Sequence, residues 1–89
     1  MKWRIQIDVL RPGGGVTIYT ASLSQPRAPK LDEPLKVSGL TFRVCFVRQT
    51  DVSEWQVICR TKVETAAQVR AVSQAMKDAE FTVTRSFRR

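Results

Sequence analysis

Residues 65–79 read TAAQVRAVSQAMKDA, and this stretch decides the fold because it predicts a helix with a single apolar stripe. It contains neither Gly nor Pro, and Thr65 followed by Gln68 forms the capping-box pattern that begins many helices. Within the predicted helix, 66–79, apolar residues recur at spacings of three and four. They are Val69, Val72, Met76 and Ala79. A helix with one apolar stripe packs against one surface, which in this chain must be a sheet.

Five segments around the helix show the alternation of polar and apolar residues that is typical of β-strands. They comprise residues 2–10, 16–23, 40–48, 55–63 and 81–87. Connections at 11–15 and 51–54 join the first four strands into two antiparallel hairpins, and the helix leads directly into the fifth strand. We therefore predict an α+β fold, a two-layer sandwich in which one helix covers one face of a mainly antiparallel sheet of about five strands.

The segment between the two hairpins, residues 24–39, carries three of the four prolines and is predicted to be irregular. A segment of this length without secondary structure is long for so small a domain. Leu31, Leu35 and Val37 can anchor it, so we expect an ordered crossing over the surface of the domain.

Strand alternation also predicts the core and the environment of the two cysteines. A four-residue loop in the second hairpin places Phe46 opposite Cys59 and turns Cys45 to the other face of the sheet, so two free thiols are expected. The predicted core consists of Trp3, Ile5, Ile7, Ile18, Phe42, Val44, Phe46, Val57, Val69, Val72, Met76, Phe81 and Val83.

The composition indicates one small domain with a basic surface. The 89 residues suffice for one hydrophobic core, so residues 1–89 form a single domain. Lys and Arg number 15 against 8 Asp and Glu, and the resulting charge of +7 attracts polyanions. No apolar run approaches the ~20 residues of a membrane-spanning helix, and the alternating N-terminus lacks the apolar region of a signal peptide. We expect a cytoplasmic protein that does not engage membranes.

The outer face of the predicted sheet, which the helix leaves uncovered, combines cations from three strands with one aromatic ring. Single-stranded nucleic acid is bound by this combination, because cations neutralise the phosphates while aromatic rings stack on the bases. The candidate nucleic-acid-binding residues are Arg4, Tyr19, Arg43, Arg60 and Lys62. Binding of this kind is weakly sequence-selective, since the helix carries few side chains that could read bases.

The same basic face has a second interpretation that the sequence leaves open. Antiparallel sheets commonly expose one face to water, and Lys and Arg on that face oppose edge-to-edge aggregation. In that case the face is merely solvated, and the protein acts through protein–protein contacts or as a homo-oligomer. An open sheet has two edges at which a partner or a second copy can pair.

The residue types argue against catalysis. The chain has no histidine, which removes the commonest general base and the commonest metal ligand. A thiolate nucleophile at Cys45 or Cys59 needs a neighbouring base, and two cysteines cannot complete a four-ligand zinc site. We therefore predict a binding module with no catalytic residues, no metal and no small-molecule cofactor.

Overall fold

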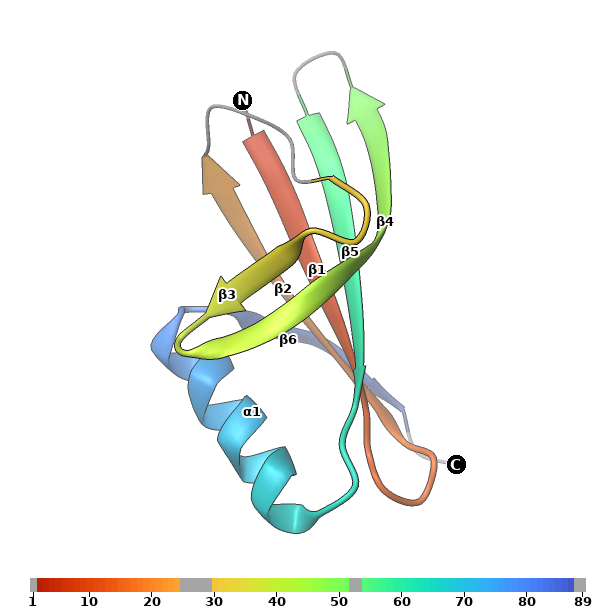
Figure 1. Ribbon diagram of the computed structural model, residues 1–89, viewed down its shortest axis with the longest axis vertical. Coiled ribbons are helices and arrows are strands. Elements are labelled where there is room, and N and C mark those ends of the chain that lie inside the picture. Colours follow the sequence, from red (N-terminus) through yellow and green to blue (C-terminus); the bar gives the residue numbers. More distant parts are fainter. Residues whose placement is uncertain (1, 25–29, 52–53, 88–89) are drawn as a thin grey trace.

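The computed structural model describes residues 2–24, 30–51 and 54–87. In these ranges it contains six strands and one helix, which Figure 1 labels in chain order. They are β1 (Lys2–Leu10), β2 (Val16–Ser24), β3 (Pro34–Val37), β4 (Leu40–Asp51), β5 (Glu54–Lys62), α1 (Ala66–Asp78) and β6 (Thr82–Phe87). The predicted α+β class, with a mostly antiparallel sheet and a helix near the C-terminus, is confirmed. Of the helices in the described ranges, none has the length and apolar character needed to span a membrane.

The six strands form one sheet in the order β3-β4-β5-β1-β2-β6. Both predicted hairpins, β1 with β2 and β4 with β5, are present and antiparallel. The central pair, β1 and β5, is parallel, with Ile5 opposite Val57 and Ile7 opposite Cys59. Because β1 lies between β2 and β5, both of its edges are hydrogen-bonded, and it occupies the middle of the sheet.

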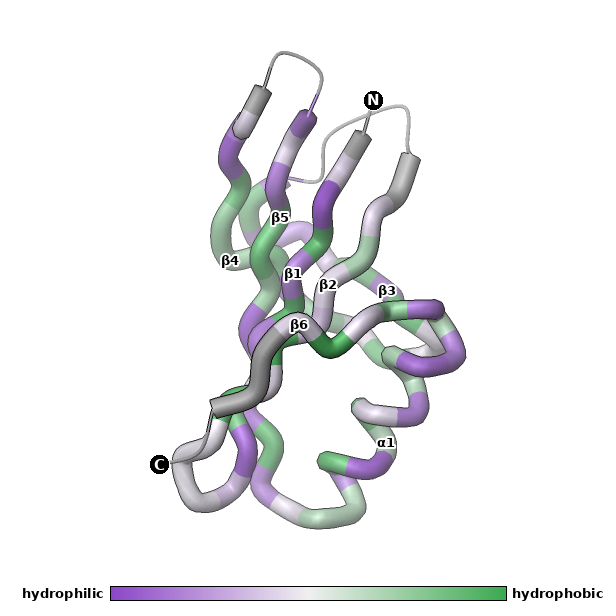
Figure 2. Tube along the Cα trace, turned by 180° about the vertical axis from the view of Figure 1, so that it is seen from behind, coloured by the Kyte–Doolittle hydropathy of each residue, from purple (hydrophilic) through white to green (hydrophobic). Residues whose placement is uncertain are grey.

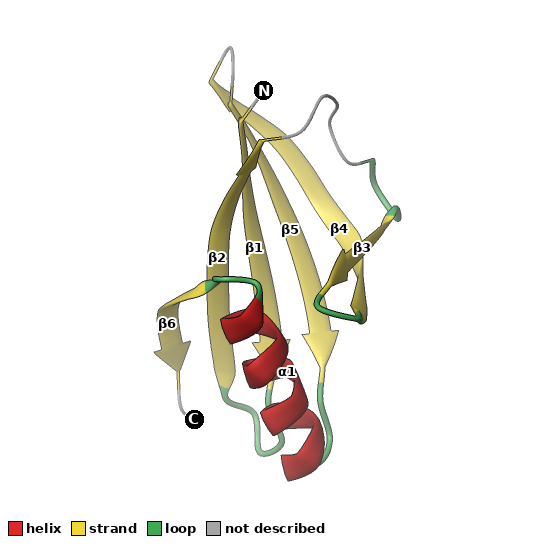
Figure 3. Cartoon of the chain, turned by 90° about the vertical axis from the view of Figure 1, so that its left-hand side faces the viewer, coloured by secondary structure: helices red, strands yellow, loops and turns green. Residues whose placement is uncertain are grey.

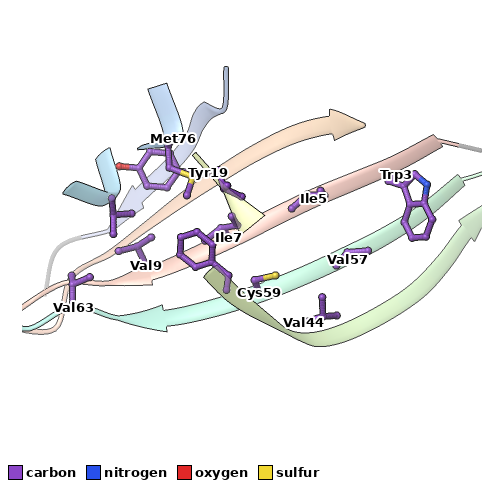
Figure 4. Close-up of a cluster of buried hydrophobic side chains, with 13 residues drawn as sticks. Trp3, Ile5, Ile7, Val9, Tyr19, Val44, Val57, Cys59, Val63 and Met76 are labelled. Carbon is purple, nitrogen blue, oxygen red and sulfur yellow. The ribbon is translucent and has the colours of Figure 1, made fainter. Parts of the chain in front are cut away.

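The core is built on the face of β1 that carries its apolar residues. Trp3, Ile5, Ile7 and Val9 are each at most 3% exposed, because every second residue of a strand points to the same side. Burying such a side chain contributes roughly 1.5–3 kcal/mol. Figure 4 shows this row of side chains together with Val44, Val57 and Cys59 from the neighbouring strands.

Helix α1 covers this inner face of the sheet, as its single apolar stripe predicts (Figure 3). Val72 and Met76 are buried against the core, and Val69 is partly buried. The predicted capping box is also confirmed. Thr65 Oγ1 accepts a hydrogen bond from the Gln68 backbone N–H at 3.1 Å, and Gln68 Oε1 accepts one from the Thr65 N–H at 3.1 Å.

A strand that the sequence did not predict lies within the segment expected to be irregular. Strand β3 begins at Pro34. The first residue of a strand is a position at which the missing N–H of proline is tolerated. Ser38 and Gly39 then form a two-residue turn in which both φ angles are positive, 46° and 87°, as a type I′ hairpin turn requires. Strand β4 bends strongly and carries β3 over the face that α1 also covers (Figure 1).

A β-bulge in β4 changes which side chains face the core. Val44 lies opposite Cys59 and Phe46 opposite Ile58, so Cys45 is an extra residue in β4. The expected pairing of Phe46 with Cys59 is therefore wrong. Phe46 was also predicted to be buried, but it lies on the opposite face from Val44 and is 47% exposed.

Two other residues of the predicted core lie outside it. Ile18 is opposite Asp8 and so shares the polar face of β1. Val83 is 54% exposed, because it lies on β6 at the edge of the sheet. The remaining predicted core residues are buried or pack against the buried cluster.

Helix α1 ends in a Schellman motif whose left-handed residue is not glycine. The Phe81 N–H donates to Met76 O at 2.8 Å, and the Glu80 N–H donates to Lys77 O at 3.1 Å. Glu80 has a φ of 62°, a region in which a Cβ atom is unfavourable. Its carboxylate also lies at the negative end of the helix dipole.

Glu80→Gly should therefore raise the free energy of unfolding by about 0.5–1 kcal/mol, because it removes both the Cβ strain and the unfavourable charge. Urea denaturation of the two proteins measures the difference. Ser73→Gly, at an exposed position inside the helix, is the matched control and should lower stability by about 0.5 kcal/mol. A loss of stability in Glu80→Gly would show that the left-handed conformation is not strained.

Candidate nucleic-acid interface

The face of the sheet opposite α1, here called the outer face, is the candidate interface. Figure 2 views the sheet from this side, and in the described part of the chain no helix covers it. Strand pairing places its side chains in rows that cross β4, β5, β1 and β2. They include Arg4, Gln6, Asp8, Ile18, Thr20, Phe46, Arg48, Glu54, Gln56, Ile58, Arg60 and Lys62.

Four of the five residues predicted for this interface are cations that the structure leaves accessible. Arg4 on β1 and both Arg60 and Lys62 on β5 are exposed on the outer face. Arg43 is exposed on β4, on the opposite side of that strand from the buried Phe42 and Val44. It pairs with Pro34 of β3, so it belongs to the bent part of β4 and not to the central rows.

The fifth predicted residue, Tyr19, does not belong to this face, and its expected exposure is wrong. It lies opposite Ile7 in the β1–β2 hairpin and is only 9% exposed. Figure 4 shows it among the buried side chains together with Met76. The signal was present in the sequence. A five-residue loop that pairs Leu10 with Val16 also pairs Ile7 with Tyr19, and directly opposite residues share a face.

Among the side chains that the structure describes, the aromatic ring on the outer face is that of Phe46, which the strand alternation predicted to lie in the core. Its strand partner is the half-buried Ile58. Arg48 follows it by two residues on β4, and Arg60 follows Ile58 by two residues on β5. Because the bulge turns both Phe46 and Arg48 outward, neither position could be found from the regular alternation of β4. A single exposed apolar residue is ordinary, but this one lies between arginines.

Side-chain hydrogen bonds connect the rows of the outer face. Arg48 Nε donates to Gln56 Oε1 at 2.7 Å, and Gln56 Nε2 donates to Gln6 Oε1 at 3.4 Å. Gln6 Nε2 donates to Asp8 Oδ1 at 2.9 Å, and Asp8 Oδ2 lies 3.9 Å from Arg60 Nη2. This chain of contacts crosses β4, β5 and β1. It orients the Arg48 side chain through a short hydrogen bond, whereas the longer ion pair leaves the exposed Arg60 side chain free to move.

The outer face remains positive after its ion pairs are taken into account. Among the side chains that the structure describes, its carboxylates are those of Asp8, beside Arg60, and of Glu54, whose Oε1 lies 3.6 Å from Arg4 Nη2. The Arg4 and Glu54 side chains are 61% and 37% exposed, so their pair contributes little to stability and is easily displaced. Among the described residues, Arg48 and Lys62 have no carboxylate partner. The face can therefore attract a polyanion.

Away from the central rows of the outer face, a hollow lies between residues 11–15 and the start of α1. Its volume is about 640 Å³, and its lining includes Arg11, Arg70, Glu64 and the apolar Val69. The backbone N–H groups of Glu64 and Thr65 already donate to Gln68 Oε1. Because its lining mixes both charges with apolar groups, this hollow does not indicate one class of ligand.

The two cysteines are free thiols in different environments. Cys45 is exposed at the bulge, and its Sγ donates to Ile58 O at 3.2 Å. Cys59 is fully buried. Burial raises the pKa of the Cys59 thiol from 9.0 to about 11, with smaller contributions from Cys45 and Asp8. Cys59 is therefore a protonated core residue at neutral pH.

This raised pKa predicts a loss of stability in alkaline solution. Between pH 9 and pH 11 the Cys59 thiol ionises in the unfolded chain but keeps its proton in the folded protein, so ionisation favours unfolding. The stability is fully present below pH 9. Urea denaturation across this pH window should show a steeper decline for the wild type than for Cys59→Val, which keeps an apolar side chain without a thiol. Parallel declines in the two proteins would contradict the prediction.

Among the described residues, no three Cys, Asp or Glu side chains come together as a metal site requires. Comparison of the chain with protein-family models, with curated proteins and with solved structures gave no match. A fold class alone does not imply a function. Inference of function therefore depends on the outer face itself.

Proposed function

We propose that this protein is a small non-enzymatic module that binds single-stranded nucleic acid on its outer face, with weak sequence selectivity. The observation that carries the proposal is the exposed ring of Phe46 between Arg48 and Arg60, on a sheet face that α1 leaves open. Phe46 takes the stacking role that the sequence suggested for Tyr19.

The charges supply affinity without selectivity. Arg48, Arg60 and Lys62 lie on adjacent strands, so one polynucleotide backbone crossing the rows can contact all three. Each phosphate that is neutralised releases counterions, which makes binding favourable at low salt. The hydrogen bond that Arg48 donates to Gln56 limits the motion of the Arg48 side chain, so less side-chain entropy is lost when this arginine binds a phosphate.

Stacking supplies the preference for single strands. A base that stacks on an aromatic side chain contributes about 1–3 kcal/mol whatever its identity, because every base has a π-face. In a duplex the bases are already stacked on one another, so the Phe46 ring has no free base face to contact. The helix offers no alternative mode, since α1 packs on the inner face and is poor in side chains that read a groove.

A labelled thymine oligonucleotide should therefore bind at low salt and lose about 20- to 50-fold in affinity between ~50 mM and ~200 mM salt, as three or four phosphate contacts imply. Fluorescence anisotropy measures both affinities. Phe46→Ala should weaken binding by at least about 5-fold. The double variant Arg48→Ala/Arg60→Ala should lower the salt slope by about 0.7 for each arginine.

Two matched controls separate the outer face from general effects. Leu31→Ala removes another exposed apolar side chain, and Arg70→Ala/Lys77→Ala removes two exposed cations from α1. Leu31→Ala should leave binding unchanged, and the α1 variant should lower affinity much less than the outer-face variant. Absence of binding at ~50 mM salt, or equal losses in the outer-face and control variants, would show that the basic face is only solvated.

Self-association is the second candidate function, and an uncovered sheet edge favours it. Strand β6 pairs with β2 only from Val16 to Thr20. Within the described ranges, the rest of β2 therefore has no strand on that side, and its backbone groups can pair with a second copy.

Sedimentation equilibrium at high protein concentration tests this candidate. A dimer that Ser22→Pro abolishes while the circular dichroism spectrum stays unchanged would place the contact at the uncovered part of β2, because proline removes a backbone donor there. A monomer at all concentrations would exclude self-association.

A further inference from the structure

A polar hollow on the outer face includes Arg48, which lies two residues along β4 from Phe46. It has a volume of about 330 Å³ and is lined by five side chains from β1, β4 and β5. They are Arg4, Arg48, Thr50, Glu54 and Gln56. Strand pairing puts Arg48 opposite Gln56 and Gln56 opposite Arg4, so these three residues form one row across the outer face. Glu54 lies in the adjacent row, where it pairs with Lys2. Each of the five described side chains is polar, unlike the mixed lining of the larger hollow.

The described lining combines one carboxylate, that of Glu54, with the guanidinium groups of Arg4 and Arg48. Arg48 uses Nε for Gln56, and a guanidinium carries further N–H donors. The ion pair between Arg4 and Glu54 is long, 3.6 Å, and exposed, so a ligand can replace it at little cost. The Glu54 carboxylate can then accept two parallel hydrogen bonds while an arginine donates to an acceptor beside them.

Guanine matches this arrangement better than the other bases. Its Watson–Crick edge presents two adjacent donors, N1–H and the N2 amino group, next to the O6 acceptor, and its N7 and O6 accept from arginine. Thymine presents one N–H between two carbonyl oxygens, which would face the carboxylate unfavourably. Adenine and cytosine each present a single amino donor on this edge, so they satisfy only one of the two carboxylate oxygens.

The hollow lies one nucleotide step from the stacking residue. Arg48 follows Phe46 by two residues on β4, and Gln56 precedes Ile58 by two residues on β5. Two residues of a strand span about 7 Å. Consecutive bases of an extended single strand can therefore occupy Phe46 and the hollow together.

We propose that the hollow lined by Arg4, Arg48, Thr50, Glu54 and Gln56 binds a guanine next to the base that stacks on Phe46. The inference rests on the proposed single-strand binding and adds one selective position to it. Glu54 is the residue that distinguishes guanine, because it is the one carboxylate among the described residues that line the hollow. The arginines and Phe46 contribute to the binding of any sequence.

Thymine oligonucleotides with one central position changed to guanine, cytosine or adenine test the proposal by fluorescence anisotropy. A single guanine avoids self-structure of the probe. The guanine oligonucleotide should bind the wild type at least about 5-fold more tightly than the all-thymine one, the lower end of what one bidentate contact provides. Glu54→Gln should abolish this ratio. Glu80→Gln, which removes an equal charge at the end of α1, should preserve it.

The outcomes separate the pocket from the proposed function. If all four oligonucleotides bind equally and Phe46→Ala weakens them all, the single-strand interface stands and the guanine pocket is wrong. A preference for cytosine or adenine, or a guanine preference that survives Glu54→Gln, would also overturn the pocket. If no oligonucleotide binds, both the proposed function and the pocket fail.

Discussion

The burial of one face of β1 is the constraint on which the rest of the structure depends. Trp3, Ile5, Ile7 and Val9 lie in a single row, and both neighbouring strands add apolar residues to it. Helix α1 and the bent β4 then cover this row from the same side, with Met76 and Val44 in the buried cluster. Strand alternation sends the residues between the core positions of β1 to the other face of the sheet, which is mostly polar and charged, with Ile18, Phe46 and Ile58 as apolar exceptions.

That division gives the outer face its character. Residues alternating with the core row, such as Arg4, Gln6 and Asp8, cannot reach the interior and are satisfied by neighbours across the strands. The hydrogen bonds that link them keep the charged groups ordered while leaving them accessible to solvent. A covered sheet face provides stability, whereas an open one with ordered cations provides a surface on which a flexible polyanion can lie.

One extra residue in β4 converts this polar surface into a candidate binding site. Without the bulge at Cys45, Phe46 and Arg48 would continue the alternation of Phe42 and Val44 into the core, where an arginine would be costly to bury. The bulge moves both outward and bends the strand, which allows its first half to carry β3 over the core. The bulge at Cys45 therefore explains three features together. They are the exposure of the Phe46 ring, the outward position of the Arg48 guanidinium and the covering of the core by β3.

The sequence by itself determined the α+β class, the helix with its capping box, both long hairpins and the basic character of the open face. These follow from local periodicity, composition and short loops, which act between residues close in the chain. Only the tertiary structure decided the parallel pairing of β1 with β5, the strand at Pro34 and the face of Phe46. Each of these depends on which distant strands meet and in what register, and a shift of one residue moves a side chain to the other face. Tyr19 stands between the two cases, because the short loop before β2 already implied its pairing with Ile7.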